Sequence, residues 1–124
     1  LTGTLFALII LLIVNIYSEK FKKYEVVDTN GAVTLMDDDL IILDVREEKE
    51  RSAGFIDSDL NIPMGQVKSK LDSLDKSKKI LVYCKSGTRS DRTADLLCKN
   101  EFQNVYSLKG GFNAWQKAEL PIKK

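Results

Sequence analysis

The residues best placed to do chemistry are the six from Cys84 to Arg89, Cys-Lys-Ser-Gly-Thr-Arg, which follow an apolar run and precede a helical pattern. Cysteine reacts as the thiolate, so its surroundings must stabilise negative charge. Gly87 allows the backbone to curl with a positive φ angle, and successive N–H groups of a curled loop form an anion-binding concavity. The helix that starts near Arg89 adds unpaired N-terminal N–H groups. The pattern predicts a thiolate or a persulfide anion at Cys84.

The other side chains of this loop suit an anionic sulfur donor. Lys85 and Arg89 can attract such a donor, and a guanidinium grips an oxyanion with two parallel hydrogen bonds. The chain contains no histidine, which removes histidine-assisted nucleophiles and most zinc sites from consideration. We therefore predict Cys84 as the catalytic residue, no metal or cofactor, and a substrate-binding set made of Lys85, Ser86, Gly87, Thr88 and Arg89.

Four other residues could be given a chemical role, but a structural role is predicted for each of them. Cys98 lies at helical spacing from Ala94, which predicts a core residue rather than a resolving thiol. Asp44 and Arg46 end a predicted strand, where an ion pair that anchors the sheet is favoured over catalysis. Trp115 is predicted in the core.

Short apolar runs alternate with helical patterns from Tyr24 onward, which is typical of an α/β domain with a mostly parallel sheet. Strands are predicted over 24–27, 40–45, 59–63, 80–83 and 105–108, and helical segments over 28–36, 47–53, 67–74, 89–100 and 111–115. Ligands bind beyond the carboxyl ends of the strands in such sheets. Cys84 comes directly after the strand predicted over 80–83.

The N-terminal segment has a different character. Leu5 to Val14 is an unbroken apolar run, and a core helix would need a polar face that this run lacks. We predict that residues 1–18 form a single-pass membrane anchor that contacts the membrane through 1–17, and that residues 19–124 form the domain.

The residues after the apolar run bear on membrane orientation. Tyr17 is a predicted interfacial aromatic residue, and Lys20, Lys22 and Lys23 follow it. Basic residues on that side favour a cytoplasmic catalytic domain, while an extracytoplasmic one stays open.

Composition excludes one class of partner. The chain of 124 residues has 19 basic and 18 acidic residues and a net charge of +1. It therefore lacks the overall positive field that nucleic-acid binders use, and we expect no nucleic-acid partner.

Four ordered blocks of the sequence resemble the rhodanese family, over roughly residues 24–122. The loop from Cys84 to Arg89 has the length of the family's active loop. The other blocks are Ile42–Arg46, which resembles the strand-ending Asp-Val-Arg signature, Asn61–Pro63, and the C-terminal block Val105–Trp115 with Leu120-Pro121.

One segment, from Gly54 to Asp59, departs from the family pattern. Phe55 stands where the family usually has histidine, and Ser58-Asp59 stands in place of Gly-Ala. Because this segment is mainly a packing element in the family, the departure bears on fold details more than on catalysis.

The resemblance implies a rhodanese-like α/β fold, a central mostly parallel sheet with helices on both faces, to which the N-terminal apolar helix is added. It also implies a sulfurtransferase that moves a sulfane sulfur through a Cys84 persulfide. The donor would be a small anion such as thiosulfate or a persulfide, and the acceptor a thiol or a cyanide-like nucleophile.

Two alternatives stay open. Related folds carry Cys-x5-Arg loops in phosphatases and arsenate reductases, but only four residues separate Cys84 from Arg89, which makes a smaller cradle. A non-catalytic interaction module would be marked by loss of the cysteine or the arginine, and both are present.

Overall fold

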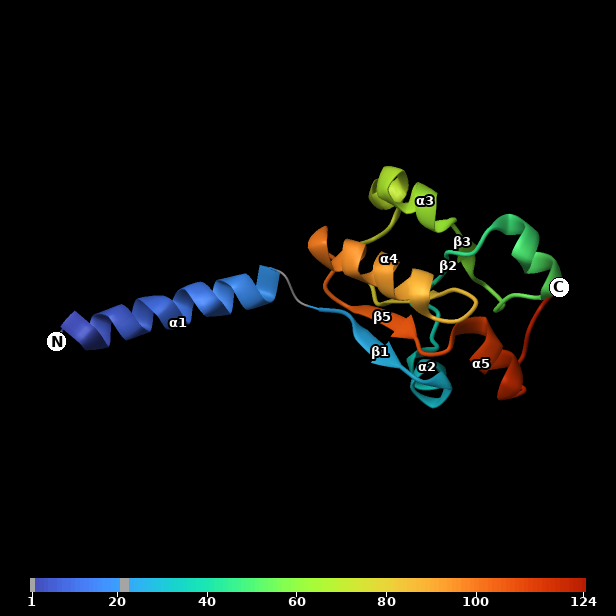
Figure 1. Cartoon of the computed structure of the whole chain (residues 1–124), viewed down its shortest axis with the longest axis horizontal. Helices are drawn as coiled ribbons and strands as arrows, with labels where there is room; N and C mark the ends of the chain where they lie inside the picture. Colours follow the sequence, from blue (N-terminus) through green and yellow to red (C-terminus); the bar gives the residue numbers. More distant parts are fainter. Residues whose placement is uncertain (1, 21–22) are drawn as a thin grey trace.

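The computed structural model describes residues 2–20 and 23–124, with side chains described for 3–15 and 23–124. Its domain is built on a five-stranded parallel sheet in the order β1-β5-β4-β2-β3 (Figure 1). The strands are β1 Glu25–Val27, β2 Ile41–Asp44, β3 Leu60–Asn61, β4 Ile80–Tyr83 and β5 Val105–Leu108. All five predicted strands are confirmed, although β1, β2 and β3 are shorter than predicted.

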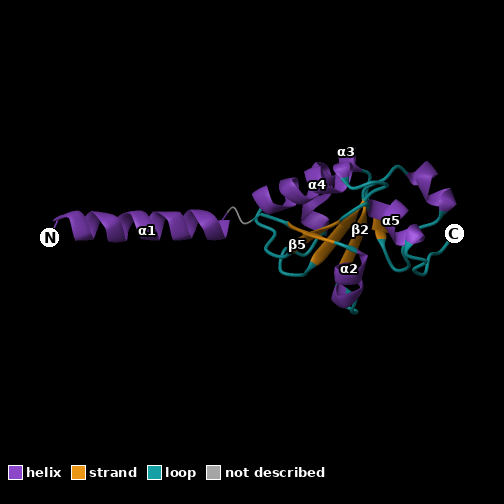
Figure 2. Ribbon diagram, turned by 60° about the horizontal axis from the view of Figure 1, so that its bottom comes forward, coloured by secondary structure: helices purple, strands orange, loops and turns teal. Residues whose placement is uncertain are grey.

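Helices lie on both faces of this sheet (Figure 2). They are α2 Thr29–Leu35, the 3₁₀ helix η1 Glu48–Ala53, α3 Met64–Val67, the 3₁₀ helix η2 Lys68–Ser73, α4 Thr88–Lys99 and α5 Gly111–Lys117. The core between the sheet and α3 and α4 includes Cys98, which is 7% exposed. The core between the sheet and α2 and α5 includes Trp115, which is 4% exposed. The predicted core positions of both residues are confirmed.

Alternation along β4 decides which way the cysteine faces. Successive side chains of a strand point to opposite faces, so Leu81 and Tyr83 pack toward α2 and α5. Ile80 and Val82 pack toward α3 and α4, and Cys84 continues that face beyond the strand. The sulfur therefore lies under the start of α4.

The N-terminal helix α1, Thr2–Lys20, extends away from the α/β domain (Figures 1 and 2). The large apolar side chains from Leu5 to Val14 are 45–66% exposed. The predicted membrane span is not supported, because no helix within the described part of the chain is long and apolar enough to cross a membrane. The side chains of Tyr17, Lys20 and Lys22, which the orientation prediction used, lie outside the described residues.

A buried ionic network ends strand β2. Asp44 is fully buried and accepts hydrogen bonds from Nε and Nη2 of Arg46, at 3.0 and 2.9 Å. The predicted strand-end ion pair is therefore confirmed. Arg51 also donates to Asp44, at 2.8 Å, and binds both oxygens of Asp59, at 2.7 and 2.8 Å.

The segment that departs from the family pattern is tied into this network. Asp59 accepts hydrogen bonds from Arg51 and from the Tyr83 hydroxyl, which in turn accepts the N–H of Ile56. Burial and the bond to Asp59 raise the pKa of Tyr83, so its phenol remains a donor. Asp59, one of the residues that replace the usual sequence, thus holds the segment against the sheet.

Ser58 in the same segment carries backbone strain that glycine would remove. Its φ angle is +66°, and a left-handed conformation costs an L-residue about 1–2 kcal/mol. Ser58→Gly is expected to raise the free energy of unfolding by roughly 0.5–1 kcal/mol, because the extra unfolded-state entropy of glycine offsets part of the relief. Urea denaturation measures this change.

The matched control for this variant is Ser52→Gly. Ser52 lies inside η1 with a negative φ angle, so glycine there should lower stability by about 0.5–1 kcal/mol. Equal destabilisation at both serines would contradict the strain assigned to Ser58.

Candidate active site

The sulfur of Cys84 lies at the base of the loop that joins β4 to α4. It accepts the backbone N–H of Gly87 at 3.0 Å and that of Ser90 at 3.4 Å. Gly87 has a φ angle of +110° and caps α4, the conformation expected from the sequence. Two main-chain dipoles therefore point at one sulfur atom, an arrangement that stabilises a thiolate or persulfide anion.

The six predicted site residues differ in burial, and Arg89 is partly buried. Cys84 is 1% exposed and Gly87 is buried, so these two lie at the base of the loop. The side chains of Lys85, Ser86 and Thr88 are exposed around it. The loop thus presents a charged and polar surface above a buried sulfur.

Two serines and an aspartate behind the cysteine were not predicted from the sequence. The hydroxyl of Ser90 lies 3.6 Å from the sulfur and donates to the carbonyl of Gly87. Ser107 on β5 lies 2.9 Å from the Ser90 hydroxyl and 2.7 Å from Oδ1 of Asp91. This chain of polar contacts holds the Ser90 hydroxyl beside the sulfur in an otherwise apolar core.

Arg89 is bound by a residue from a distant part of the sequence. Its guanidinium donates to both carboxylate oxygens of Glu50, at 2.7 and 3.0 Å. The bond to Arg89 lowers the pKa of Glu50 to about 2. Arg89 therefore links α4 to η1, and its charge is matched by the Glu50 carboxylate.

This ion pair predicts an acid-dependent share of stability. The folded-state pKa of Glu50 lies below the ordinary value of 4.5, at about 2, so the stabilisation is present above pH 4.5 and is lost as the pH falls toward 2. Glu50→Gln is expected to lower the midpoint of thermal unfolding by a constant amount at pH 5–7. The difference from wild type should shrink below pH 4.5, and a difference that is unchanged at pH 2.5 would contradict the pairing.

The start of α5 packs directly on the active loop. The N–H of Phe112 donates to the carbonyl of Cys84 at 2.7 Å, and the N–H of Asn113 to that of Lys85 at 3.0 Å. Gly111 has a φ angle of +58°, and a Cβ atom there would lie 2.5 Å from the Cys84 carbonyl oxygen. Only glycine allows this close approach, which ties the loop to α5.

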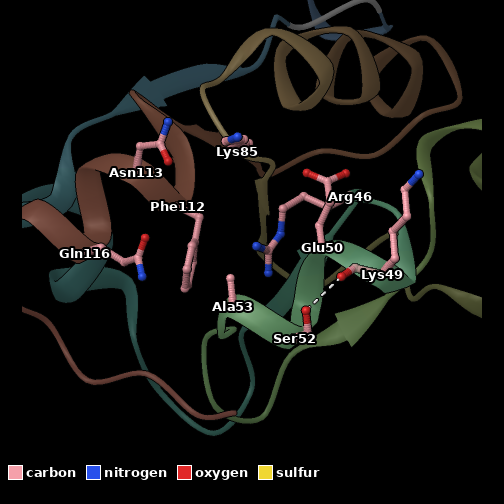
Figure 3. Close-up of a pocket in the computed structure, with 9 residues that line it drawn as sticks. All are labelled: Arg46, Lys49, Glu50, Ser52, Ala53, Lys85, Phe112, Asn113 and Gln116. Atoms are coloured by element: carbon pink, nitrogen blue, oxygen red, sulfur yellow. Dashed lines mark hydrogen bonds between the residues drawn. The ribbon is translucent and has the colours of Figure 1, made fainter.

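A pocket of about 220 Å³ opens beside the loop, between η1 and α5. Figure 3 shows Lys49 on the η1 side and Gln116 and Asn113 on the α5 side, with Phe112 and Ala53 between them. Its other lining residues are Arg46, Glu50, Ser52 and Lys85. The last of these follows Cys84 in the chain, so the pocket adjoins the loop.

The fold and this loop define the class of protein. The sequence profile of the rhodanese-like domain matches residues 29–118. The chain therefore belongs to the rhodanese-like domain family, as the resemblance of its sequence blocks implied.

Individual relatives extend this match. The thiosulfate sulfurtransferase GlpE of Coxiella burnetii is 36% identical over 78 residues, which cover 63% of this chain and 73% of that protein. The uncharacterized protein YqhL of Bacillus subtilis is 39% identical over 74 residues, but the alignment spans only 59% of YqhL and 60% of this chain. The crystal structure of a rhodanese-related protein from Thermoplasma volcanium superposes with a TM-score of 0.75 at 26% identity, over 81% of this chain and 98% of that one.

Proposed function

We propose that this domain is a sulfurtransferase that carries a sulfane sulfur as a persulfide on Cys84. The observation that carries the proposal is the Cys84 sulfur at the base of the loop, with the N–H groups of Gly87 and Ser90 directed at it. A relative that this chain matches over 73% of its length, GlpE of Coxiella burnetii, is named a thiosulfate sulfurtransferase. Thiosulfate is therefore the first donor to test, and an organic persulfide the second.

The reaction takes place in two covalent steps. The Cys84 thiolate attacks the outer sulfur of thiosulfate, a Cys84–S–S⁻ persulfide forms, and sulfite leaves with the electrons of the broken S–S bond. A nucleophilic acceptor then attacks the outer sulfur of the persulfide. With cyanide the products are thiocyanate and the regenerated thiolate, so each step exchanges one bond to sulfur for another.

The position of Arg89 supports sulfur transfer over phosphate hydrolysis. A phosphatase needs its loop arginine to grip a tetrahedral oxyanion with two hydrogen bonds, whereas both terminal nitrogens of Arg89 are bound to Glu50. The anion site that the loop offers is the space around one sulfur atom. We therefore propose that Arg89 acts mainly by holding the loop, while Lys85, Ser86 and Thr88 meet the incoming donor.

Intact-mass spectrometry tests this function directly. The chain is incubated with excess thiosulfate, and the donor is then removed. We expect Cys84 to gain one sulfur atom, which cyanide then releases as thiocyanate. If no sulfur is gained under donor excess, the non-catalytic interaction module is the better interpretation. Cys84-dependent hydrolysis of an aryl phosphate would instead favour a phosphatase.

We also propose that α1 attaches the domain to a membrane. Its apolar side chains from Leu5 to Val14 are exposed, and monomeric soluble proteins rarely expose so large a contiguous apolar surface. Liposome flotation of the full chain against a Leu8→Lys/Leu12→Lys variant tests this. Equal flotation of the two chains would contradict the attachment.

A further inference from the structure

We propose that Ser90, Ser107 and Asp91 form a proton relay that removes the thiol proton of Cys84 before the sulfur reacts. The relay rests on the proposed function and deepens it, because it supplies the thiolate for the first step of sulfur transfer. Its three side chains lie outside the six-residue loop, and Asp91 is the terminal proton acceptor.

The buried sulfur needs a route for its proton. Cys84 is 1% exposed, and the chain has no histidine to act as a general base. Among the described residues, the groups hydrogen-bonded to the sulfur are the N–H groups of Gly87 and Ser90 and the Ser90 hydroxyl. The two N–H groups stabilise a thiolate once it has formed, but they cannot accept a proton. The Ser90 hydroxyl can, because its oxygen lies 3.6 Å from the sulfur and accepts the S–H bond.

A chain of hydroxyl groups leads from Ser90 to a carboxylate that water can reach. Helix α4 packs on β5 (Figure 1). This packing places the Ser107 oxygen 2.9 Å from that of Ser90 and 2.7 Å from Oδ1 of Asp91. Both serines are fully buried, whereas Asp91 is partly exposed. Asp91 can therefore release a proton to water, which neither serine can.

The carboxylate sets the direction of these hydrogen bonds. Ser107 has one proton to donate and a carboxylate only accepts, so the short bond to Asp91 carries the Ser107 proton. The Ser107 oxygen then accepts from Ser90. The single proton of Ser90 can turn from the Gly87 carbonyl, at 3.0 Å, to the Ser107 oxygen. Every bond in the chain then points from the sulfur to Asp91.

The transfer balances without any further reactant. The Cys84 proton passes to the Ser90 oxygen, and the Ser90 proton passes to Ser107. The proton of Ser107 then passes to Oδ1 of Asp91. One S–H bond breaks with its electron pair left on the sulfur, and one O–H bond forms on the carboxylate. Both serines remain neutral hydroxyls, and water takes the proton from Asp91.

Charge alone predicts the opposite effect for Asp91. A carboxylate near the sulfur disfavours a thiolate through like-charge repulsion, so loss of its charge would speed the loading of sulfur onto Cys84. Loss of a proton acceptor would slow it. The sign of the change in Asp91→Asn therefore distinguishes the two roles.

The experiment follows single-turnover loading of the reduced full chain with thiosulfate at about pH 6, below the ordinary pKa of a cysteine thiol. Rapid quenching and intact-mass spectrometry measure the sulfur gained. The rate constant at low thiosulfate reports the equilibrium share of thiolate, whereas the maximal rate at high thiosulfate reports how fast the proton leaves. These two quantities separate a proton route from a change in site structure.

Asp91→Asn keeps the shape of the side chain but cannot take up the proton. A positioned proton acceptor contributes about 10²–10⁴-fold, and slow direct loss of the proton to water remains, so we expect the maximal rate to fall by about tenfold or more. Proton loss and proton return slow equally, so the rate constant at low thiosulfate should not fall.

Two further variants are matched to this one. Ser107→Ala interrupts the same relay and should give a similar loss, and the double variant should lose no more than either single variant. The control is Asp95→Asn, which removes the same charge one turn further along α4, from an exposed carboxylate that pairs with Lys99. It should load like wild type.

Wild type should also show a lower maximal rate in D₂O, because proton transfer limits that rate. An unchanged or raised maximal rate in Asp91→Asn, or equal maximal rates of wild type in H₂O and D₂O, overturns the relay. A fall confined to the rate constant at low thiosulfate also overturns it, because that result marks a structural role. Failure of wild type to gain sulfur at all would instead count against the proposed function, so the two failures are distinguishable.

Discussion

Replacing Cys84 by serine is expected to lower the rate of thiocyanate formation from thiosulfate and cyanide by a factor of at least about 10³. Losses of this scale are seen when a catalytic nucleophile is removed. A serine hydroxyl at this position would face the same N–H groups of Gly87 and Ser90. It cannot form a persulfide, because the reaction needs a sulfur nucleophile. The initial rate of thiocyanate formation measures the loss.

The second cysteine supplies the control. Cys98 is a buried residue of α4 in the same apolar core as Cys84, so Cys98→Ala should cost about 1 kcal/mol of stability through lost packing. Its turnover should stay within about twofold of wild type, because core packing away from the loop does not alter the nucleophile. Retained turnover in Cys84→Ser together with lost turnover in Cys98→Ala would reverse the assignment.

The fold could be predicted from the sequence where local patterns carry the information. Each predicted strand is a short segment that contains apolar residues, with 80–83 apolar throughout, and each is present in the sheet. The helical segment predicted over 67–74 is less regular than expected. It divides into α3 and η2, and Lys70 departs from helical backbone angles with φ −117°. Hydrophobic spacing detects that such a segment packs on the core but does not distinguish an α-helix from 3₁₀ turns.

The site was predictable only where its residues are neighbours in the chain. Cys84 and Gly87 are three positions apart, and the curl between them follows from a glycine in the loop between the strand and the helix. The contacts of Ser90 with Ser107 and of Arg89 with Glu50 join different elements. These contacts arise when distant elements pack together, and no local sequence pattern predicts them.

One unpredicted contact was within reach of sequence reasoning. Ser90 is the third residue of α4, and the N–H groups of the first turn of any helix lack partners within the helix. The predicted site residues end at Arg89. They therefore leave out Ser90, whose backbone N–H is the second hydrogen-bond donor to the Cys84 sulfur.

The largest expected effect on stability comes from Asp44. This carboxylate is fully buried between Arg46 and Arg51, and it also accepts the backbone N–H of Arg46 at 2.9 Å. Asp44→Asn keeps the shape of the side chain but removes its charge. Arg46, which is 2% exposed, is then left as a buried cation without its counter-charge, so we expect a loss of about 3–5 kcal/mol of unfolding free energy.

The magnitude matters because small domains have only about 5–15 kcal/mol of stability in total. Urea denaturation of Asp44→Asn should therefore show a much lower midpoint with an unchanged slope. The control is Asp57→Asn, whose carboxylate is 64% exposed and 4.0 Å from Lys123, and which should cost at most about 0.5 kcal/mol. A loss below 1 kcal/mol in Asp44→Asn would show that water or a rearranged side chain compensates Arg46.

A double variant tells whether the stability lost in Asp44→Asn comes from leaving Arg46 as an unpaired buried charge or from losing its attraction to Asp44. If the unpaired charge is the cause, Asp44→Leu combined with Arg46→Met should recover part of the lost stability. Apolar pairs often replace buried ion pairs at little cost. Arg51 retains Asp59 as its partner in that variant. Arg46 also lines the pocket beside the active loop, so a variant that regains stability but discharges the Cys84 persulfide more slowly would assign Arg46 a role in shaping that pocket.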